Sequence, residues 1–329
     1  MPWIQLQPHL FSALPAHPAL PDNSSRPQLQ HFTRAALHEA LELLHSIPST
    51  FTTDPKLRPS EPSEAKVKLL RGYRKPSQSV SDNSGPQDKS KAEFWVCRQS
   101  EHVDATAQGT ASWEEFETGL RSNHAEHEME YTPSVTGIER LLEWAEEEIG
   151  EVEVDGVVFR EVGVEVNLMT HTFHPTALIS PRSFISLAIS AAYNTQPTDP
   201  QSQSQSPTKG FVTAQIPLRS TAAATPDTLH ERIIATAPRK TIFANYASVE
   251  RVTLLPAQPS QRERHIDWTM ATTSDAGGSI PQWVQRSWTL GGVPRAVVAD
   301  VGLFMGWTMA RRGSIQGQAD VSEDRQTSS

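Results

Sequence analysis

The stretch VVFREVGVEVNLMTH, residues 157–171, decides the fold class because apolar side chains recur at every second position in its second half. On an extended chain, successive side chains point to opposite faces. One face therefore carries four apolar residues: Val162, Val164, Val166 and Leu168. The other face carries Gly163, Glu165, Asn167, Met169 and His171. A period of two predicts a β-hairpin or a bent strand pair that is buried on one side.

Further strands are predicted before and after this stretch. Apolar and β-branched runs bounded by turn residues indicate five of them: residues 94–98, 184–190, 211–218, 242–255 and 264–273. After the last strand, residues 281–311 are predicted to form one long helix with a kink at Gly291-Gly292. An apolar stripe along that helix includes Trp283, Val301, Phe304 and Met305.

Three helices are predicted upstream of the strand at 157–171. Residues 32–47 carry apolar side chains at helical spacing, and Pro48 is expected to end that helix. Ser112 begins a second helix, because Glu115 occupies the position from which a capping box reaches back to the cap. Residues 137–149 are predicted to form the third. This order predicts an α+β fold in which a curved antiparallel sheet wraps around the long C-terminal helix and encloses a cavity.

Segments rich in Pro, Ser, Lys and Gln separate the predicted elements and lack the apolar groups that would offset the entropy of ordering them. The expected organisation is an N-terminal helical segment (1–47), a disordered linker (48–91), a main domain (92–312) with disordered insertions near 194–209 and 219–240, and a disordered tail (313–329). Within the second insertion, residues 229–234 could form a short helix.

Composition excludes several classes of protein. The chain has 329 residues and a formal net charge of −9, so it lacks the basic balance that nucleic-acid binding requires. Its single cysteine, Cys97, excludes an internal disulfide and a thiolate zinc site, which indicates a reducing compartment. The N-terminal residues lack a secretory signal, and no apolar run reaches the ~18 residues of a membrane span. We therefore expect a cytoplasmic protein without cofactor.

Two pairs of histidines are spaced closely enough to be candidate metal ligands. His124 and His127 lie in an acidic stretch, residues 113–155, that we interpret as a solvated face without an evident third ligand. His171 and His174 lie at a strand end, where polar side chains are usually exposed. The sequence therefore predicts no metal site.

Two motifs and four other runs carry a resemblance to a known family. Residues 180–184, SPRSF, lead into a strand, and residues 275–284, DAGGSIPQWV, join the last strand to the C-terminal helix. Both resemble motifs of the START domain of steroid and phospholipid transfer proteins, a helix-grip fold, with Ser183 in place of the usual acid. The four runs look more specifically like the fungal START-like family called domain of unknown function 3074: residues 111–116, 130–133, 247–252 and 268–275. The resemblance covers residues 94–311.

The resemblance implies a lipid-sized hydrophobic cavity and no catalytic centre. The implied function is the non-enzymatic binding of a lipid or sterol and its transfer, with transient membrane contact and no nucleic-acid partner. The candidate residues for the cavity come from the strand face described above, the 180–184 motif, the last strand and the C-terminal helix: Glu165, Asn167, Met169, His171, Arg182, Trp268, Met270, Trp283, Val301, Phe304 and Met305.

Two other functions stay open at the level of the sequence. A cyclase or hydrolase of the wider helix-grip superfamily could use Glu165 and His171 as acid and base, because they share a strand face. If that face lines the cavity, burial raises the pKa of Glu165, which then needs Arg182, Arg251 or a ligand hydroxyl as partner. The face could instead point to solvent. The third hypothesis is a protein-interaction module with a filled interior, whose Pro/Ser-rich segments bind partners.

Overall fold

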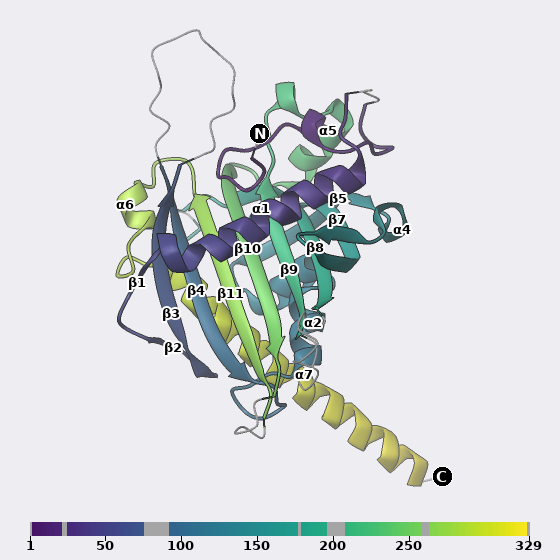
Figure 1. The fold of residues 1–329 in the computed structure, drawn as a ribbon, viewed down its shortest axis with the longest axis vertical. Coiled ribbons are helices and arrows are strands. Elements are labelled where there is room, and N and C mark those ends of the chain that lie inside the picture. Colours follow the sequence, from purple (N-terminus) through teal and green to yellow (C-terminus); the bar gives the residue numbers. More distant parts are fainter. Residues whose placement is uncertain are drawn as a thin grey trace.

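A curved antiparallel sheet organises the protein (Figure 1). The computed structural model describes residues 2–21, 25–75, 92–176, 179–195, 208–257 and 263–327, with side chains as far as residue 314. Within these residues the sheet has 11 strands. Its main path runs through β1 (Thr52–Thr53), β3 (Ser63–Arg74), β4 (Glu93–Val103), β11 (His265–Asp275), β10 (Ile242–Leu255), β9 (Thr208–Pro217), β8 (Arg182–Thr195), β7 (Val157–His171) and β5 (Val135–Trp144). Two short strands pair off this path: β2 (Arg58–Ser60) with β3, and β6 (Val152–Val154) with β7.

The strand register determines which residues meet at one end of the sheet. His171, the last residue of β7, pairs with Arg182, the first residue of β8. Arg182 also pairs with Ile242 at the start of β10, in the single parallel pairing among the described strands. Asp275, at the end of β11, lies opposite Asn245 of β10. The ends of β7 and β11 and the beginnings of β8 and β10 therefore lie at the same end of the sheet.

Helices cover both faces of the sheet (Figure 1). We call the face that packs against α1 (Leu29–Thr50) the outer face and the face that packs against α7 (Val293–Thr327) the inner face. On the inner side, α2 (Trp113–Leu120) and α3 (His124–Tyr131) lie beside α7. The shorter helices are α4 (Glu146–Ile149), α5 (Asp227–Thr236), α6 (Gln282–Gln285) and the 3-10 turns η1 (Phe11–Ala13) and η3 (Ala222–Ala224).

The predicted α+β, helix-grip architecture is confirmed, and so is the alternation over residues 162–168. The predicted hairpin or strand pair is wrong, because residues 157–171 form the single strand β7, with one register shift between Arg160 and Gly163. The apolar residues of that stretch, Val162 to Leu168, are buried in the outer core together with Leu37 and Leu44 of α1. The capping box at the start of α2 is also present. The amide of Glu115 donates to Ser112 Oγ at 3.4 Å, and the amide of Ser112 donates to Glu115 Oε2 at 2.8 Å.

The predicted helix over residues 137–149 is wrong, because most of it forms β5 and only its end forms α4. The pairing of β5 with β7 shifts register twice, between Val135 and Gly137 and between Arg140 and Leu142. Each shift places an extra residue in the strand and breaks the period of two. Adjacent Leu141 and Leu142 are both buried as a result, which imitates helical spacing in the sequence.

The predicted disordered linker is wrong over residues 52–74, which form β1, β2 and β3. The segment has few large apolar groups, but β4 offers it a free edge, and pairing runs from Lys68 opposite Gln99 to Arg74 opposite Glu93. Residues 76–91 lie outside the described residues. The predicted helix end at Pro48 is also wrong, because α1 continues to Thr50; Pro48 lies in the last turn, where it removes only one backbone hydrogen bond.

Two further disorder predictions need correction. The 219–240 insertion forms η3 and α5, and α5 buries Leu229 and Ile233 in the outer core. The backbone of the 313–329 tail continues α7 as far as Thr327. For the insertion near 194–209, β8 extends to Thr195 and β9 begins at Thr208, and the residues between them lie outside the described part of the chain.

The predicted C-terminal helix is divided into α6 and α7, with the predicted kink at the division. Gly291 has φ +78°, a left-handed conformation that favours glycine, and a side chain on Gly292 would collide with the Gln285 carbonyl. Both glycines are therefore required by the sharp turn before α7.

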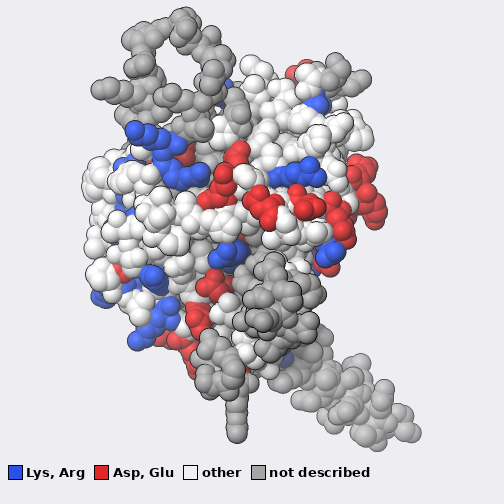
Figure 2. All heavy atoms as spheres, in the orientation of Figure 1, with Lys and Arg blue, Asp and Glu red and all other residues white. Residues whose placement is uncertain are grey.

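The surface near α4 agrees with the solvated acidic face predicted for residues 113–155. On the side that carries α1, acidic side chains gather near α4 (Figure 2). Glu146, Glu147 and Glu148 are exposed there, as predicted. Among the described residues, no helix is both long enough and apolar enough to span a membrane.

Candidate ligand-binding cavity

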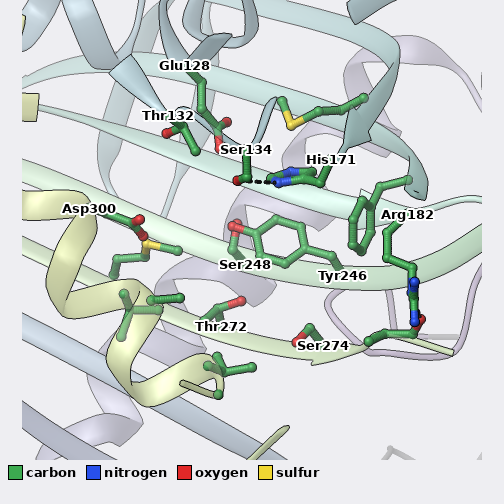
Figure 3. A pocket seen from close by; sticks show the side chains of 18 of the residues that line it. Glu128, Thr132, Ser134, His171, Arg182, Tyr246, Ser248, Thr272, Ser274 and Asp300 are labelled. Carbon is green, nitrogen blue, oxygen red and sulfur yellow. Dashed lines mark hydrogen bonds between the residues drawn. The ribbon is translucent and has the colours of Figure 1, made fainter. Parts of the chain in front are cut away.

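A cavity of about 600 Å³ lies between the inner face of the sheet and helices α3 and α7 (Figure 3). Ligand sites in proteins typically measure ~300–1,000 Å³, so this volume suits a small molecule. Side chains of β4 and β7 to β11 form one wall. Leu120 of α2, side chains of α3, α6 and α7, and the segments after α3, β7, β11 and α6 form the remainder.

The cavity has a closed end and an exposed end. At the closed end, which we call the inner end, Trp268 packs against Phe116 and Phe304, with ring centres 5.3 and 5.4 Å away. At the other end, which we call the mouth, Phe173 and Leu290 line the cavity and are 39% and 54% exposed. A ligand could therefore enter between the segment after β7 and the segment after β11.

Five of the residues predicted from the sequence line this cavity. They are Met169, His171, Arg182, Trp268 and Met270. Met169 and His171 come from the strand face predicted by the alternation, and Arg182, Trp268 and Met270 come from the runs 180–184 and 268–275 that carry the resemblance. Their side chains converge because β7, β8 and β11 turn the same face toward α7.

Glu165 and Asn167 lie on the same strand face but do not line the cavity. Asn167 Nδ2 donates to Glu165 Oε1 at 2.7 Å, and Arg140 Nε lies 3.0 Å from Glu165 Oε2. The partner of Glu165 is therefore Arg140 of β5, and not Arg182 or Arg251. Burial raises the pKa of Glu165, while the Asn167 hydrogen bond and the Arg140 charge oppose this increase.

Four residues of the predicted helical stripe also lie elsewhere. Val301, Phe304 and Met305 are fully buried in the core behind the inner end, so they close the cavity without lining it. Trp283 is 67% exposed on α6. Because α6 is a single turn, only one side of it faces the cavity, and Val284 and Gln285 occupy that side.

His171 and Arg182 lie near the mouth. Ser134 Oγ and His171 Nδ1 are 3.1 Å apart, and burial lowers the pKa of His171 to about 4, which leaves the ring neutral at physiological pH. Arg182 Nε donates to the Ala276 carbonyl at 2.9 Å, and its Nη1 donates to the Ser180 carbonyl. Arg182 therefore joins the two segments that border the mouth.

The inner end contains a buried ion pair that the sequence did not predict. Arg98 Nη2 lies 2.9 Å from Glu250 Oε1, which also accepts a hydrogen bond from Trp268 Nε1 at 2.7 Å. The Arg98 guanidinium lies 3.8 Å from the centre of the Trp268 ring. Arg98 is 1% exposed, and its Nε and Nη1 have no hydrogen-bond partner among the described residues.

Two carboxyl groups enter the same end of the cavity, Glu128 from α3 and Asp300 from α7 (Figure 3). Burial raises the pKa of Glu128 to about 8, with contributions from Asp300 and Glu250. Burial also raises the pKa of Asp300 to about 6, against the opposing charge of Arg98. Near neutral pH, Glu128 is therefore mainly protonated and Asp300 mainly ionised.

The prediction that residues around His124 are solvated is wrong for one side of α3. His124 and Glu128, one helical turn apart, both face the cavity, with His124 Nε2 3.6 Å from Glu128 Oε2. Among the described residues, no group of three His, Cys, Asp or Glu side chains could hold a metal ion.

The geometry does not assemble the acid–base pair of the enzyme hypothesis, because Glu165 lies outside the cavity and His171 lies within it. The cavity also opposes the filled interior that the interaction-module hypothesis requires. The arrangement can hold an amphiphile, with an apolar wall from α6 and α7 and a cluster of carboxyl groups at the inner end.

Comparisons with known proteins agree with the sequence motifs. A family model described as "Protein of unknown function (DUF3074)" matches residues 95–308. A search of curated proteins gave no match. Among solved structures, the chain is similar to the crystal structure of human STARD10, with a TM-score of 0.45, 10% identity, and coverage of 85% of this chain and 83% of that chain. It is also similar to human StAR-related lipid transfer protein 5, with a TM-score of 0.46, 12% identity, and coverage of 87% and 100%. Likeness at this level says nothing of ligand or activity.

Proposed function

The chain belongs to the family described as protein of unknown function (DUF3074), as its motifs predicted, and we propose that it binds a hydrophobic ligand, a lipid or sterol, in the cavity beneath α7. The family description names no activity, so the proposal depends on the cavity. Its single strongest support is the cavity of about 600 Å³ between the sheet and α7, closed at the inner end and open at the mouth.

The apolar part of the cavity wall supports a hydrocarbon ligand. Met169, Phe184 and Met270 line it from the sheet, and Val293 and Val297 line it from α7. Each methylene group moved from water to such a surface contributes ~0.8 kcal/mol to binding. A long hydrocarbon chain or a sterol ring system can therefore overcome the entropy lost on association.

Transfer between membranes is the second part of the proposal. Trp283 is 67% exposed and Leu290 is 54% exposed, and both belong to the segment that borders the mouth. Tryptophan is favoured at the boundary between lipid and water, because its ring is apolar and its N–H is polar. Contact of this segment with a bilayer would bring the mouth to the source of the ligand.

Met270→Asp tests the binding site. It places a carboxylate on the cavity wall, opposite Arg98 and Glu250, where it disturbs their ion pair and removes apolar surface. We therefore expect loss of fluorescent sterol or phospholipid binding and a loss of ~2–4 kcal/mol in the free energy of unfolding. Binding would be measured by fluorescence titration and folding by circular dichroism. Met270→Leu is the matched control and retains both properties. Unchanged binding by a folded Met270→Asp protein would place the ligand outside the cavity.

A further inference from the structure

We propose that the inner end of the cavity binds the protonated amine of an amphiphilic ligand that also carries a hydroxyl, with the hydrocarbon part of the ligand extending toward the mouth. This inference rests on the proposed function and adds the chemical class of the ligand. Six side chains at the inner end carry it: Arg98, Glu128, Tyr131, Tyr246, Glu250 and Asp300.

The charges at the inner end lack one cation. Arg98 is balanced by Glu250 at 2.9 Å, which leaves two carboxyl groups: Asp300, mainly ionised near neutral pH, and Glu128, mainly protonated. Within the part of the chain that the structure describes, no Lys or Arg lies within ion-pair distance of either group, and Glu128 has only His124, at 3.6 Å. A buried carboxylate without a partner is unfavourable. A ligand ammonium group would supply the missing charge, whereas a ligand carboxylate or phosphate would add repulsion.

Arg98 provides an independent indication of a ligand. It is 1% exposed and lines the cavity, yet its Nε and Nη1 donate to no described residue. A buried guanidinium N–H without an acceptor is costly, so an oxygen atom belongs beside it. A hydroxyl on the ligand, next to the amine, would accept this hydrogen bond and could donate to a carboxylate.

Aromatic side chains complete a site suited to a cation. Tyr131 and Tyr246 line the cavity, and burial raises the pKa of both phenols, with smaller contributions from Glu128, Glu250 and Asp300. In Figure 3, Tyr246 lies between the side that holds Glu128 and Asp300 and the side that holds Arg182. The face of an aromatic ring attracts an ammonium group, and more strongly when water is excluded.

The direction of the ligand follows from the remainder of the wall. Between the inner end and the mouth, α6, α7 and the segment after β11 form an apolar wall with Val297, Val293, Ile280 and Val284, whereas the sheet opposite carries the hydroxyl groups of Ser248, Thr272 and Ser274. The apolar side chains offer no hydrogen bonds, so a hydrocarbon chain suits that side of the cavity. The amine therefore enters first, and the chain fills the space behind it.

The pH dependence follows from the two carboxyl groups. Asp300 has a pKa of about 6 and Glu128 a pKa of about 8, each raised mainly by burial. The other ionisable groups that face them are Arg98 and Glu250 from the sheet, His124 and Tyr131 from α3, and Tyr246 from β10. Binding of an ammonium group is coupled to ionisation of the carboxyl groups, so affinity falls as pH decreases through 6. Binding of an uncharged alcohol does not depend on pH in this way.

The test uses the full chain, stripped of lipid, and four probes of equal chain length presented from cyclodextrin: sphinganine, octadecylamine, octadecanol and octadecanoate. Bound probe is measured by mass spectrometry after gel filtration at pH 7.5 and pH 5. We expect sphinganine to bind most tightly, then octadecylamine, then octadecanol, with octadecanoate weakest. Affinity for the two amines should fall about tenfold between pH 7.5 and pH 5, while that for octadecanol stays constant.

Variants identify the groups responsible. Asp300→Asn keeps the shape of the side chain and removes its charge, so it should lower amine affinity about tenfold, flatten the pH dependence and leave octadecanol binding unchanged. Glu128→Gln, a second variant on a different helix, should also lower amine affinity. Glu114→Gln, on the exposed side of α2, is the control and should change nothing.

The outcomes separate this inference from the proposed function. Equal binding of amines, octadecanol and octadecanoate, or amine binding that Asp300→Asn and Glu128→Gln leave intact, would overturn the inference and leave the cavity as a general lipid site. Absence of binding by all four probes, together with unchanged sterol or phospholipid binding in Met270→Asp, would overturn both.

Discussion

The outer and inner faces of the sheet differ although the same strands form both. On β10, Ala247 and Val249 point to the outer face and are fully buried beneath α1. Their neighbours Tyr246, Ser248 and Glu250 point to the inner face and line the cavity. The outer face is packed as a continuous apolar core, whereas the inner face combines an aromatic cluster with an enclosed space.

This difference changes how strand alternation should be interpreted. A strand with one apolar and one polar face usually covers a core on one side and meets solvent on the other. Here α1 covers one side of the sheet and α7 covers the other, so the polar residues of β10 face a cavity inside the protein. A polar strand face can therefore mark a binding site as well as a solvated surface.

The largest expected effect comes from breaking the ion pair on the inner face. Arg98→Met leaves Glu250 buried without its cation, so we expect a loss of ~3–5 kcal/mol in the free energy of unfolding, measured by urea denaturation. The double variant Arg98→Met with Glu250→Leu removes both charges and should recover much of that loss. A single variant as stable as the parent would show that the pair is open to water.

A smaller effect is expected at Leu187 on the outer face of β8, which can be compared with its neighbour Ser186 on the inner face. Leu187→Ala opens a space in the packed core beneath α1 and should reduce the free energy of unfolding by about 3 kcal/mol. Ser186→Ala, on the inner face, removes one long hydrogen bond of 3.5 Å to Gln215 and should change stability by less than ~1 kcal/mol. Denaturation of the two variants under the same conditions compares the faces directly, and equal losses would contradict the contrast between them.

The smallest effect on stability is expected at the mouth. Trp283 is 67% exposed, so Trp283→Ala should alter the free energy of unfolding by no more than ~0.5 kcal/mol. It should slow transfer of a fluorescent lipid between vesicles by about fivefold, equivalent to ~1 kcal/mol of lost burial in the bilayer surface. Ile234→Ala is the control, because Ile234 on α5 is also an exposed apolar residue, and it should leave transfer unchanged. If both variants transfer lipid at the parent rate, the mouth segment does not dock on the membrane.

The sequence predicted the parts of the fold that follow a regular period. The alternation of Val162 to Leu168 identified β7 and its buried face, and the Ser112 capping box identified α2. Periodicity failed where pairing decides the structure. The register shifts of β5 imitate a helix, and β3 is ordered through the edge of β4 despite its polar composition.

The candidate site was predictable only in part, for a related reason. Alternation assigns a residue to a face but not to a position along the cavity, so Met169 and His171 line it while Glu165 does not. Arg98, Glu128, Glu250 and Asp300 lie on four elements far apart in the sequence, and only the fold brings them together. A charged residue beside or within an apolar run, such as Arg98 after FWVC or Asp300 in the run AVVADVGLFM, was an available signal.

The N-terminal segment ties the outer helix to the sheet, which affects where the protein can be shortened. Glu39 of α1 accepts the amides of Trp3 at 2.6 Å and Ile4 at 3.0 Å, and Glu93 of β4 accepts the amide of Leu6 at 2.7 Å. A fragment limited to the region of the family match, residues 95–308, would lose α1 and β3. It would expose both an unpaired strand edge and the apolar outer face, and these are the two surfaces from which β-rich proteins aggregate. The boundary of sequence similarity is therefore not a boundary at which this protein can be cut and expressed.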